Sequence, residues 1–233
     1  MQSMPTAADF NSRRVTNPGQ SEIIRQRLYD YQLYAYAGTT QLSFFQQPVG
    51  SGLTTALGST VGAVKTLWDT NMSIGGTLPS GSAYYVESIE VVFFPGSVQT
   101  ANTYTPIGFS VFNATASAAV NAALNDTNTF YQSGLLEFNI LAKNYLRETP
   151  LLAFPPKANF NLDVAVASNS ATTAEVALGQ ARAAGRPYYI DPAISIQPAV
   201  NFEVVLKFPA AVALAFNARV GVILDGYFMR ASQ

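Results

Sequence analysis

The sequence predicts an all-β protein built as a single eight-stranded jelly roll, a β-sandwich with short helical inserts in its loops and an extended N-terminal arm. About eight segments alternate apolar and polar residues with a period of two. Pro, Gly and Asn separate these segments. The 233 residues leave room for one such roll with long loops, whereas two rolls would leave nothing for the arm and a linker.

The predicted strands become clear from Tyr84 onward. Residues 84–96 place Ile89 and Val91 on one face and end at a Pro-Gly pair. Residues 219–230 (RVGVILDGYFMR) are apolar on both faces, which predicts a central strand covered on both sides. Further strands are predicted over 105–112, 134–141, 160–166 and 202–208, and a hairpin is predicted within 31–50, turning at Gly38.

One short pattern occurs twice, as PLLAFPPKANFNLDVAVA from Pro150 and as PAISIQPAVNFEVVLKF from Pro192. Both copies contain Pro, an apolar pair, a second Pro, Asn-Phe and an alternating strand. Proline cannot donate a hydrogen bond to a sheet ladder, so it suits the first residue of a strand. We expect the copies to begin equivalent strands in two Greek-key halves, although chance similarity between two buried strands would give the same pattern.

Helices are expected only in connections. Residues 172–185 begin with a capping box formed by Thr172 and Glu175, which predicts a short helix. Residues 113–126 are rich in Ala and are compatible with either a short helix or a loop.

The first thirty residues are predicted to form an arm. Residues 1–20 are polar, and Ser21 precedes apolar residues at helical spacing, which predicts one or two helical turns. We therefore divide the chain into an N-terminal arm with a short helix, residues 1–30, and a jelly-roll domain, residues 31–233.

The residue types argue against an enzyme. The chain has no His and no Cys, which removes the usual general base and the thiolate metal ligands. The Gly/Ser/Thr-rich residues 50–64 lack the Gly-Lys-Ser/Thr ending of a phosphate-binding loop. We predict no catalytic, cofactor-binding or metal-binding residues, no cofactor and no small-molecule substrate.

Charge is scarce. Only 12% of the residues are charged while 48% are hydrophobic, and the net charge is -1. Ordinary domains carry about a quarter charged residues, so we expect much of this surface to contact other chains. A neutral all-β domain is the alternative.

No apolar signal region and no apolar stretch of membrane-spanning length is found in the sequence.

Two groups of residues near the N-terminus are candidate contact sites. Four of the thirteen basic residues fall within the first 27 positions, where they are suited to packaged nucleic acid or anionic lipid headgroups, unless the arm is simply solvated. The segment YDYQLYAY has more amphipathic rings than a core needs, which favours an intersubunit seam. The candidates are Arg13, Arg14, Arg25 and Arg27 for the first site, and Tyr29, Tyr31, Tyr34 and Tyr36 for the seam. Asp225, followed by Gly, is expected at a turn or bulge.

Several phrases together resemble the jelly-roll coat proteins of tailless icosahedral, often membrane-containing, bacteriophages. They are TNMSIGGTLPSGSAYYVESIEVVFF from Thr70, GLLEFNILAKNYLRETPLLAFPP from Gly134, IQPAVNFEVVLKF, and the closing VGVILDGYFMR. The resemblance implies a structural protein that forms a shell of many copies, with an arm along the inner face. The chain is shorter than the double-roll members, which leaves open a principal, minor or vertex role.

We therefore predict a non-enzymatic viral structural protein, the major capsid protein, which self-assembles into an icosahedral shell. Its partners would be further copies in a capsomer, other capsid proteins, and the packaged genome or an inner membrane through the arm. It would be assembled in the host cytoplasm and reside in the virion. The alternative is a carbohydrate-binding jelly-roll module of a phage or bacterial surface protein, and a small esterase-like or isomerase enzyme is disfavoured by the missing His.

Overall fold

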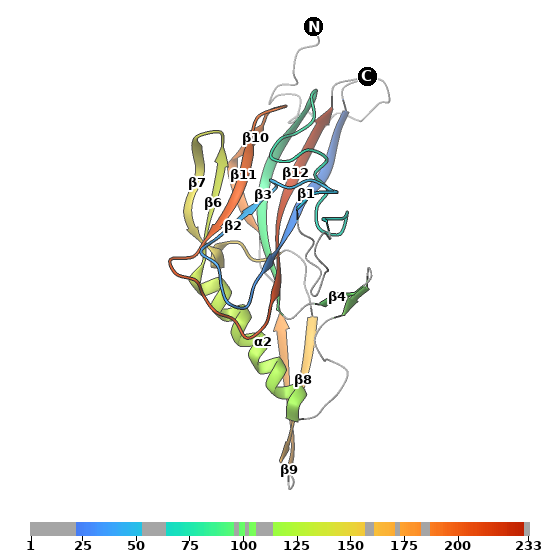
Figure 1. The fold of residues 1–233 in the computed structure, drawn as a ribbon, viewed down its shortest axis with the longest axis vertical. Coiled ribbons are helices and arrows are strands. Elements are labelled where there is room, and N and C mark those ends of the chain that lie inside the picture. Colours follow the sequence, from blue (N-terminus) through green and yellow to red (C-terminus); the bar gives the residue numbers. More distant parts are fainter. Residues whose placement is uncertain are drawn as a thin grey trace.

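Two four-stranded antiparallel sheets share one apolar core in the computed structural model of the chain (Figure 1). The predicted all-β sandwich is confirmed at this level. Eight of the twelve strands found in the described residues belong to these sheets. The structure describes residues 22–52, 64–95, 98–100, 103–105, 114–156, 161–170, 173–182 and 187–230.

The first sheet has the order β1-β12-β3-β10. β1 and β12 pair antiparallel from Glu22 opposite Arg230 to Tyr34 opposite Ala218. β12 therefore lies between two long neighbours and is buried on both faces, as predicted. The strands are β1 (Glu22–Tyr34), β12 (Ala218–Arg230), β3 (Ser82–Pro95) and β10 (Tyr188–Ile196).

The second sheet has the order β2-β11-β6-β7 and faces the first across the core. Its inner residues alternate with polar outer ones, as in β6, where Leu136 and Phe138 are buried in the core. The strands are β2 (Gln41–Phe44), β11 (Phe202–Lys207), β6 (Leu135–Ile140) and β7 (Lys143–Pro150).

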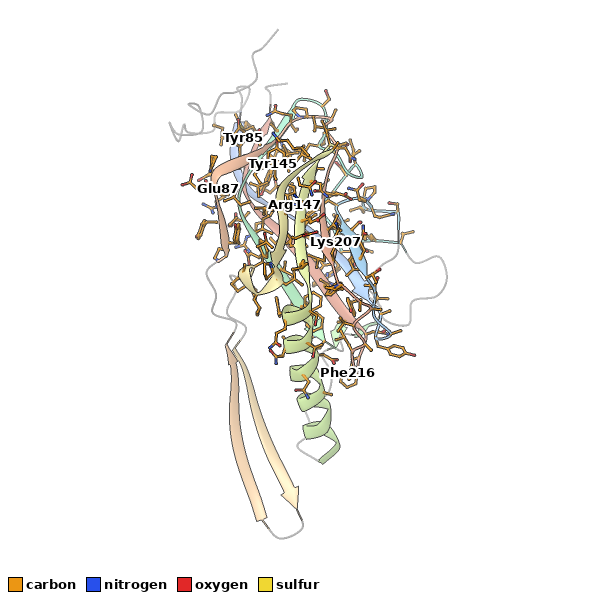
Figure 2. All side chains as sticks on the ribbon, turned by 90° about the vertical axis from the view of Figure 1, so that its left-hand side faces the viewer. Tyr85, Glu87, Tyr145, Arg147, Lys207 and Phe216 are labelled. Carbon is orange, nitrogen blue, oxygen red and sulfur yellow. The ribbon has the colours of Figure 1, made fainter. Side chains whose placement is uncertain are left out.

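The remaining elements lie in the connections. Figure 2 shows β8, β9 and α2 extending from one end of the sandwich, with β8 in contact with α2. They are the helix α2 (Ala114–Ser133), the short 3-10 helix η1 (Leu151–Ala153), the strand pair β4 (Val98–Thr100) and β5 (Thr103–Thr105), and the strand pair β8 (Asn161–Ser170) and β9 (Thr173–Arg182).

Aromatic rings close the end of the core from which α2 extends. Phe130 of α2 stacks on Phe93 of β3 with 4.3 Å between ring centroids and also contacts Tyr34 and Phe208. The Tyr131 hydroxyl donates to the Val91 carbonyl over 2.7 Å. A large buried apolar side chain contributes about 1.5–3 kcal/mol, so this cluster fixes the C-terminal half of α2 to the sandwich.

Two predicted helices are wrong. Residues 22–34, predicted to include a helical turn of the arm, form β1 because its whole length pairs with β12. Residues 173–182 form β9, paired with β8, despite the capping box at Thr172. The helix allowed over 113–126 is confirmed as α2, which continues to Ser133. The rest of the predicted arm, residues 1–21, lies outside the described residues.

The repeated pattern does not give equivalent strands. The second copy supplies β11 of the second sheet, whereas the first supplies β8 of a separate two-stranded ribbon.

The turn at Gly38 is present with a positive φ of 89°, but β1 and β2 on either side belong to different sheets. It is therefore a crossing between sheets and not a hairpin. Most of the strand predicted over 105–112 lies outside the described residues.

A buried ion pair joins β1 to the segment that precedes β3. Lys65 Nζ lies 2.7 Å from Asp30 Oδ1, and both side chains are fully buried. The other carboxylate oxygen of Asp30 accepts from the Phe45 amide over 2.7 Å, and the Thr70 side chain also hydrogen-bonds to the carboxylate. Burial raises the pKa of Asp30, while Lys65 and these hydrogen bonds oppose the rise.

Removing one member of this ion pair should lower the free energy of unfolding much more than removing both members. Asp30→Asn or Lys65→Met leaves one uncompensated charge in the core, which typically costs about 3–5 kcal/mol. The double variant should be more stable than the sum of the two single effects predicts, as measured by urea unfolding. Lys143→Met, at an exposed lysine over the Tyr145 ring, is the control and should cost less than about 1 kcal/mol. Additive single effects would contradict the pairing.

The fold should lose stability in alkali. Burial raises the pKa of both Tyr84 and Tyr131 above the ordinary value near 10. Below about pH 10 the folded and unfolded states both keep the tyrosine proton, so the free energy of unfolding does not change. Above that pH the unfolded chain loses the proton first, so the free energy of unfolding falls as pH rises. Each group should contribute a slope of up to about 1.4 kcal/mol per pH unit. Unfolding measured from pH 9 to 11 should show this fall, and it should be shallower in Tyr131→Phe.

Candidate functional site

The outer face of the first sheet carries four of the eight residues predicted to make contacts. Alternation along β1 turns its odd-numbered residues outward, including Arg25, Arg27, Tyr29 and Tyr31. Even-numbered residues such as Leu28 point to the core. This face therefore combines arginine and tyrosine side chains, two residue types that are enriched at protein interfaces.

The two arginines of β1 are neutralised by carboxylates of neighbouring strands. Arg25 makes two hydrogen bonds to Asp225, at 3.2 and 3.3 Å, and lies 3.7 Å from Glu87. Arg27 Nε lies 3.9 Å from Asp225. Only 3% of the Asp225 side chain is exposed, and its hydrogen bonds to Arg25 raise the pKa of that guanidinium. Two positive charges thus meet two negative ones, so this part of the face attracts polyanions weakly.

A bulge lies next to Asp225, on the side of β12 that pairs with β3. The register of β12 against β3 shifts between Asp225 and Gly226, which confirms the bulge expected from the Asp-Gly pair. A Cβ atom at Gly226 would lie 1.8 Å from the Tyr85 carbonyl oxygen. Glycine is therefore required there, while the uninterrupted pairing of β1 with β12 places Asp225 opposite Arg27. Of the predicted basic cluster, Arg13 and Arg14 lie outside the described residues.

The four tyrosines of the predicted seam do not share one surface. Tyr29 and Tyr31 lie side by side on the outer face, with 6.1 Å between ring centroids. Tyr34 is fully buried in the core, which corrects its assignment to a seam. Period-two alternation places its ring inward, and its hydroxyl donates to the Val212 carbonyl. Tyr36 follows the end of the strand, in the turn, and is 60% exposed.

Residues 65–70 hold two exposed apolar side chains in a fixed backbone. Leu67 is 69% exposed and Trp68 is 54% exposed. They stand between Lys65, buried against Asp30, and Asp69, which is also buried and accepts from the Thr66 amide over 3.0 Å. We call this pair the Leu67–Trp68 knob.

Side chains of the sheet hold both backbone carbonyls of the knob. The Tyr29 hydroxyl donates to the Leu67 carbonyl over 2.6 Å. The Arg219 guanidinium donates to the Trp68 carbonyl and lies 3.6 Å from the centre of the Tyr31 ring. The Tyr29 hydroxyl thus supports the knob directly, and the Tyr31 ring supports it through Arg219.

Asn71 covers the middle of the β1 edge. Its side-chain oxygen accepts from the Tyr29 amide over 3.0 Å, and its side-chain nitrogen donates to the Arg27 carbonyl over 2.8 Å. The Asn71 amide donates to the Tyr29 carbonyl, and the Tyr31 amide donates to the Asp69 carbonyl. The side chain thus replaces a peptide group of a neighbouring strand and blocks edge-to-edge pairing at this point.

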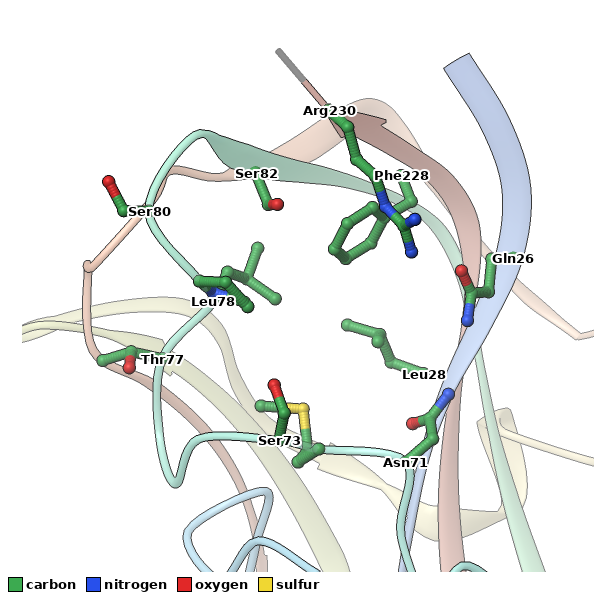
Figure 3. Close-up of a pocket in the computed structure, with 12 residues that line it drawn as sticks. Gln26, Leu28, Asn71, Ser73, Thr77, Leu78, Ser80, Ser82, Phe228 and Arg230 are labelled. Carbon is green, nitrogen blue, oxygen red and sulfur yellow. The ribbon is translucent and has the colours of Figure 1, made fainter. Parts of the chain in front are cut away.

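A pocket of about 330 Å³ lies beside the first half of β1 (Figure 3). Its apolar lining includes Leu28, Leu78 and Phe228, and its polar lining includes Gln26, Asn71 and Arg230. No group of three or more His, Cys, Asp or Glu that could hold a metal ion occurs among the residues that the structure describes. Within the same residues, no helix is long and apolar enough to cross a membrane.

A scan against protein-family models and searches of the curated proteins and of the solved structures found no match to this chain. The resemblance to phage coat proteins therefore stays a prediction from the sequence.

Sequence reasoning missed the knob and its support. Trp68 is the only tryptophan of the chain and follows Leu67 directly. This large apolar pair stands between polar residues, a signal that could have pointed to the knob. The partnership of Lys65 with Asp30 joins positions 35 residues apart, and no local pattern reveals it.

Replacing the edge-covering amide should destabilise the fold and promote association of strands. Asn71→Ala leaves the Tyr29 amide and the Arg27 carbonyl without these partners, at an expected cost of about 1–3 kcal/mol. Urea unfolding measures this cost, and thioflavin fluorescence with light scattering measures aggregation. Gln197→Ala removes an exposed amide that bonds the Ser195 side chain and should change neither. Equal behaviour of the two variants would show that Asn71 does not protect the edge.

Proposed function

We propose that this protein is a viral coat protein, an eight-stranded jelly roll that assembles with copies of itself into a closed icosahedral shell. The order of the strands carries the proposal. If the eight sandwich strands are counted along the chain from β1 to β12, omitting β4, β5, β8 and β9, the sheets read 1-8-3-6 and 2-7-4-5.

This order is that of one long hairpin rolled into a sandwich. The first strand pairs with the eighth, the second with the seventh, the third with the sixth and the fourth with the fifth, all antiparallel. Such double Greek keys of eight strands are typical of viral capsid domains, and they also occur in lectins and cupins. Fold alone does not define function, so the surface has to supply the rest of the support.

The surface supports a structural role. Charges on both sheets are balanced locally, by Arg25 with Asp225 on the first sheet and by Lys207 with Glu137, 2.8 Å apart, on the second. Surfaces with few unbalanced charges pack against neighbours with a small desolvation cost. The absence of His from the whole chain and the low proportion of charge favour a building block over an enzyme.

The proposal includes the predicted partners and location. Copies of this chain form the capsomer as its major capsid protein, other capsid proteins complete the shell in the host cytoplasm, and the virion is its final location. Contact with a packaged genome or an inner membrane is assigned to the N-terminal residues, chiefly Arg13 and Arg14. Arg25 and Arg27 contribute less, because Asp225 and Glu87 offset their charge.

Assembly of the purified full-length chain tests the proposal. Size-exclusion chromatography with light scattering, followed by negative-stain imaging, should show capsomers or shells that form with increasing concentration. Because few charges lie on the surface, assembly should change little between about 0.1 and 1 M salt. A protein that stays monomeric and is retained on a glycan column would contradict the proposal and favour the carbohydrate-binding alternative.

A further inference from the structure

The Leu67–Trp68 knob is exposed and yet rigidly placed. Buried anchors stand on both sides of it, at Lys65 and Asp69, and its two carbonyls are bonded to Tyr29 and Arg219. A group fixed before binding loses little conformational entropy when it binds. Tryptophan is also the residue type most often found at the energetic centre of interfaces. The knob therefore has the properties of an interface anchor.

The pocket beside β1 has the size and the mixed apolar and polar lining to receive such a group. A volume of about 330 Å³ is at the small end of ligand pockets and suits one or two large side chains. Leu28, Met72 and Leu78 offer apolar surface to such side chains, while the side-chain oxygens of Gln26 and Ser73 can accept from an indole N–H.

Charge disfavours nucleic acid at this place. Arg230 is the single charged residue among those that line the pocket, and the knob itself carries no charge. Polyanion binding depends on several cationic contacts. The few charges at the knob and the pocket favour a partner that is itself poor in charge, and this chain, with 12% charged residues, is such a partner.

We propose that the knob of one copy inserts into the pocket of a second copy. This inference rests on the proposed self-assembly and names the contact that begins it. Knob and pocket both lie along β1, since Asn71 lines the pocket and follows Trp68 by three residues. Because the knob and the pocket of one copy are so close, a two-fold arrangement can bring the knob of each copy to the pocket of the other. Both copies then contribute the same two surfaces to the contact.

The first experiment uses Trp68 as its own reporter, since it is the only tryptophan. As wild-type chains associate with increasing concentration, emission should shift to shorter wavelength because the indole leaves water. Trp68→Ala should weaken association measured by analytical ultracentrifugation by well over about 30-fold, the effect of losing one strong interface anchor, because the two-fold contact loses both of its knobs. Leu152→Ala, at another side chain that is 62% exposed, should leave association unchanged.

The second experiment is a complementation test. Ser73→Arg places a bulky charge at an exposed position of the pocket and should also abolish association, whereas Gln197→Arg at an exposed position outside the pocket should not. A mixture of Trp68→Ala and Ser73→Arg chains retains one intact knob and one intact pocket. It should therefore form 1:1 dimers that neither variant forms alone.

The outcomes separate this inference from the proposed function. If Trp68→Ala chains form shells as readily as the wild type, or if the mixture forms no dimers, the knob contact is wrong and the coat-protein proposal stands. If Trp68-dependent dimers form but imaging finds no capsomers or shells, the contact stands and the coat-protein proposal is wrong. A wild-type chain that is monomeric at all concentrations would overturn both.

Discussion

The ion pair between Asp30 and Lys65 is the constraint on which this molecule's working surface depends. A charge without a partner in the core is expensive, so Lys65 must stay beside β1, and residues 66–71 must then cross the outer face and edge of that strand. The exposed position of Trp68 and the covering of the edge by Asn71 both follow. One buried polar contact thus determines where the Leu67–Trp68 knob lies.

Local balancing of charge is the second organising feature. The sequence places Arg25 and Arg27 in a basic cluster, but strand pairing brings Asp225, about two hundred residues away, between them. The result is a face in which arginine serves structure and packing, with Arg25 also above the Tyr227 ring. This distinguishes it from the diffuse positive surfaces that bind nucleic acid through many unpaired cations.

Strong alternation could be read directly from the sequence for β3, β6 and β11, and a run that is apolar on both faces could be read for β12. These four strands lie where they are predicted. The failures share a cause. Ser21 and Thr172 are good helix-starting residues, yet β1 and β9 form because their partners β12 and β8 offer complete ladders, and tertiary pairing outweighs propensity. The pocket could not be predicted, because its lining joins residues from Gln26 to Arg230. The two residues of the knob are adjacent in the sequence, but the groups that hold them, Tyr29 and Arg219, are distant along the chain.

The pairing of β1 with β12 has a consequence for how the molecule is made. Glu22 needs Arg230, about two hundred residues later in the chain, as its neighbour in the sheet. β12 must therefore be synthesised before β1 can pair and the first sheet can close. Such distant partnerships fold slowly, and until then an amphipathic ribbon stays open to misassociation. Newly made chains at high cellular concentration should therefore depend on helper proteins during synthesis more than helical proteins of equal size.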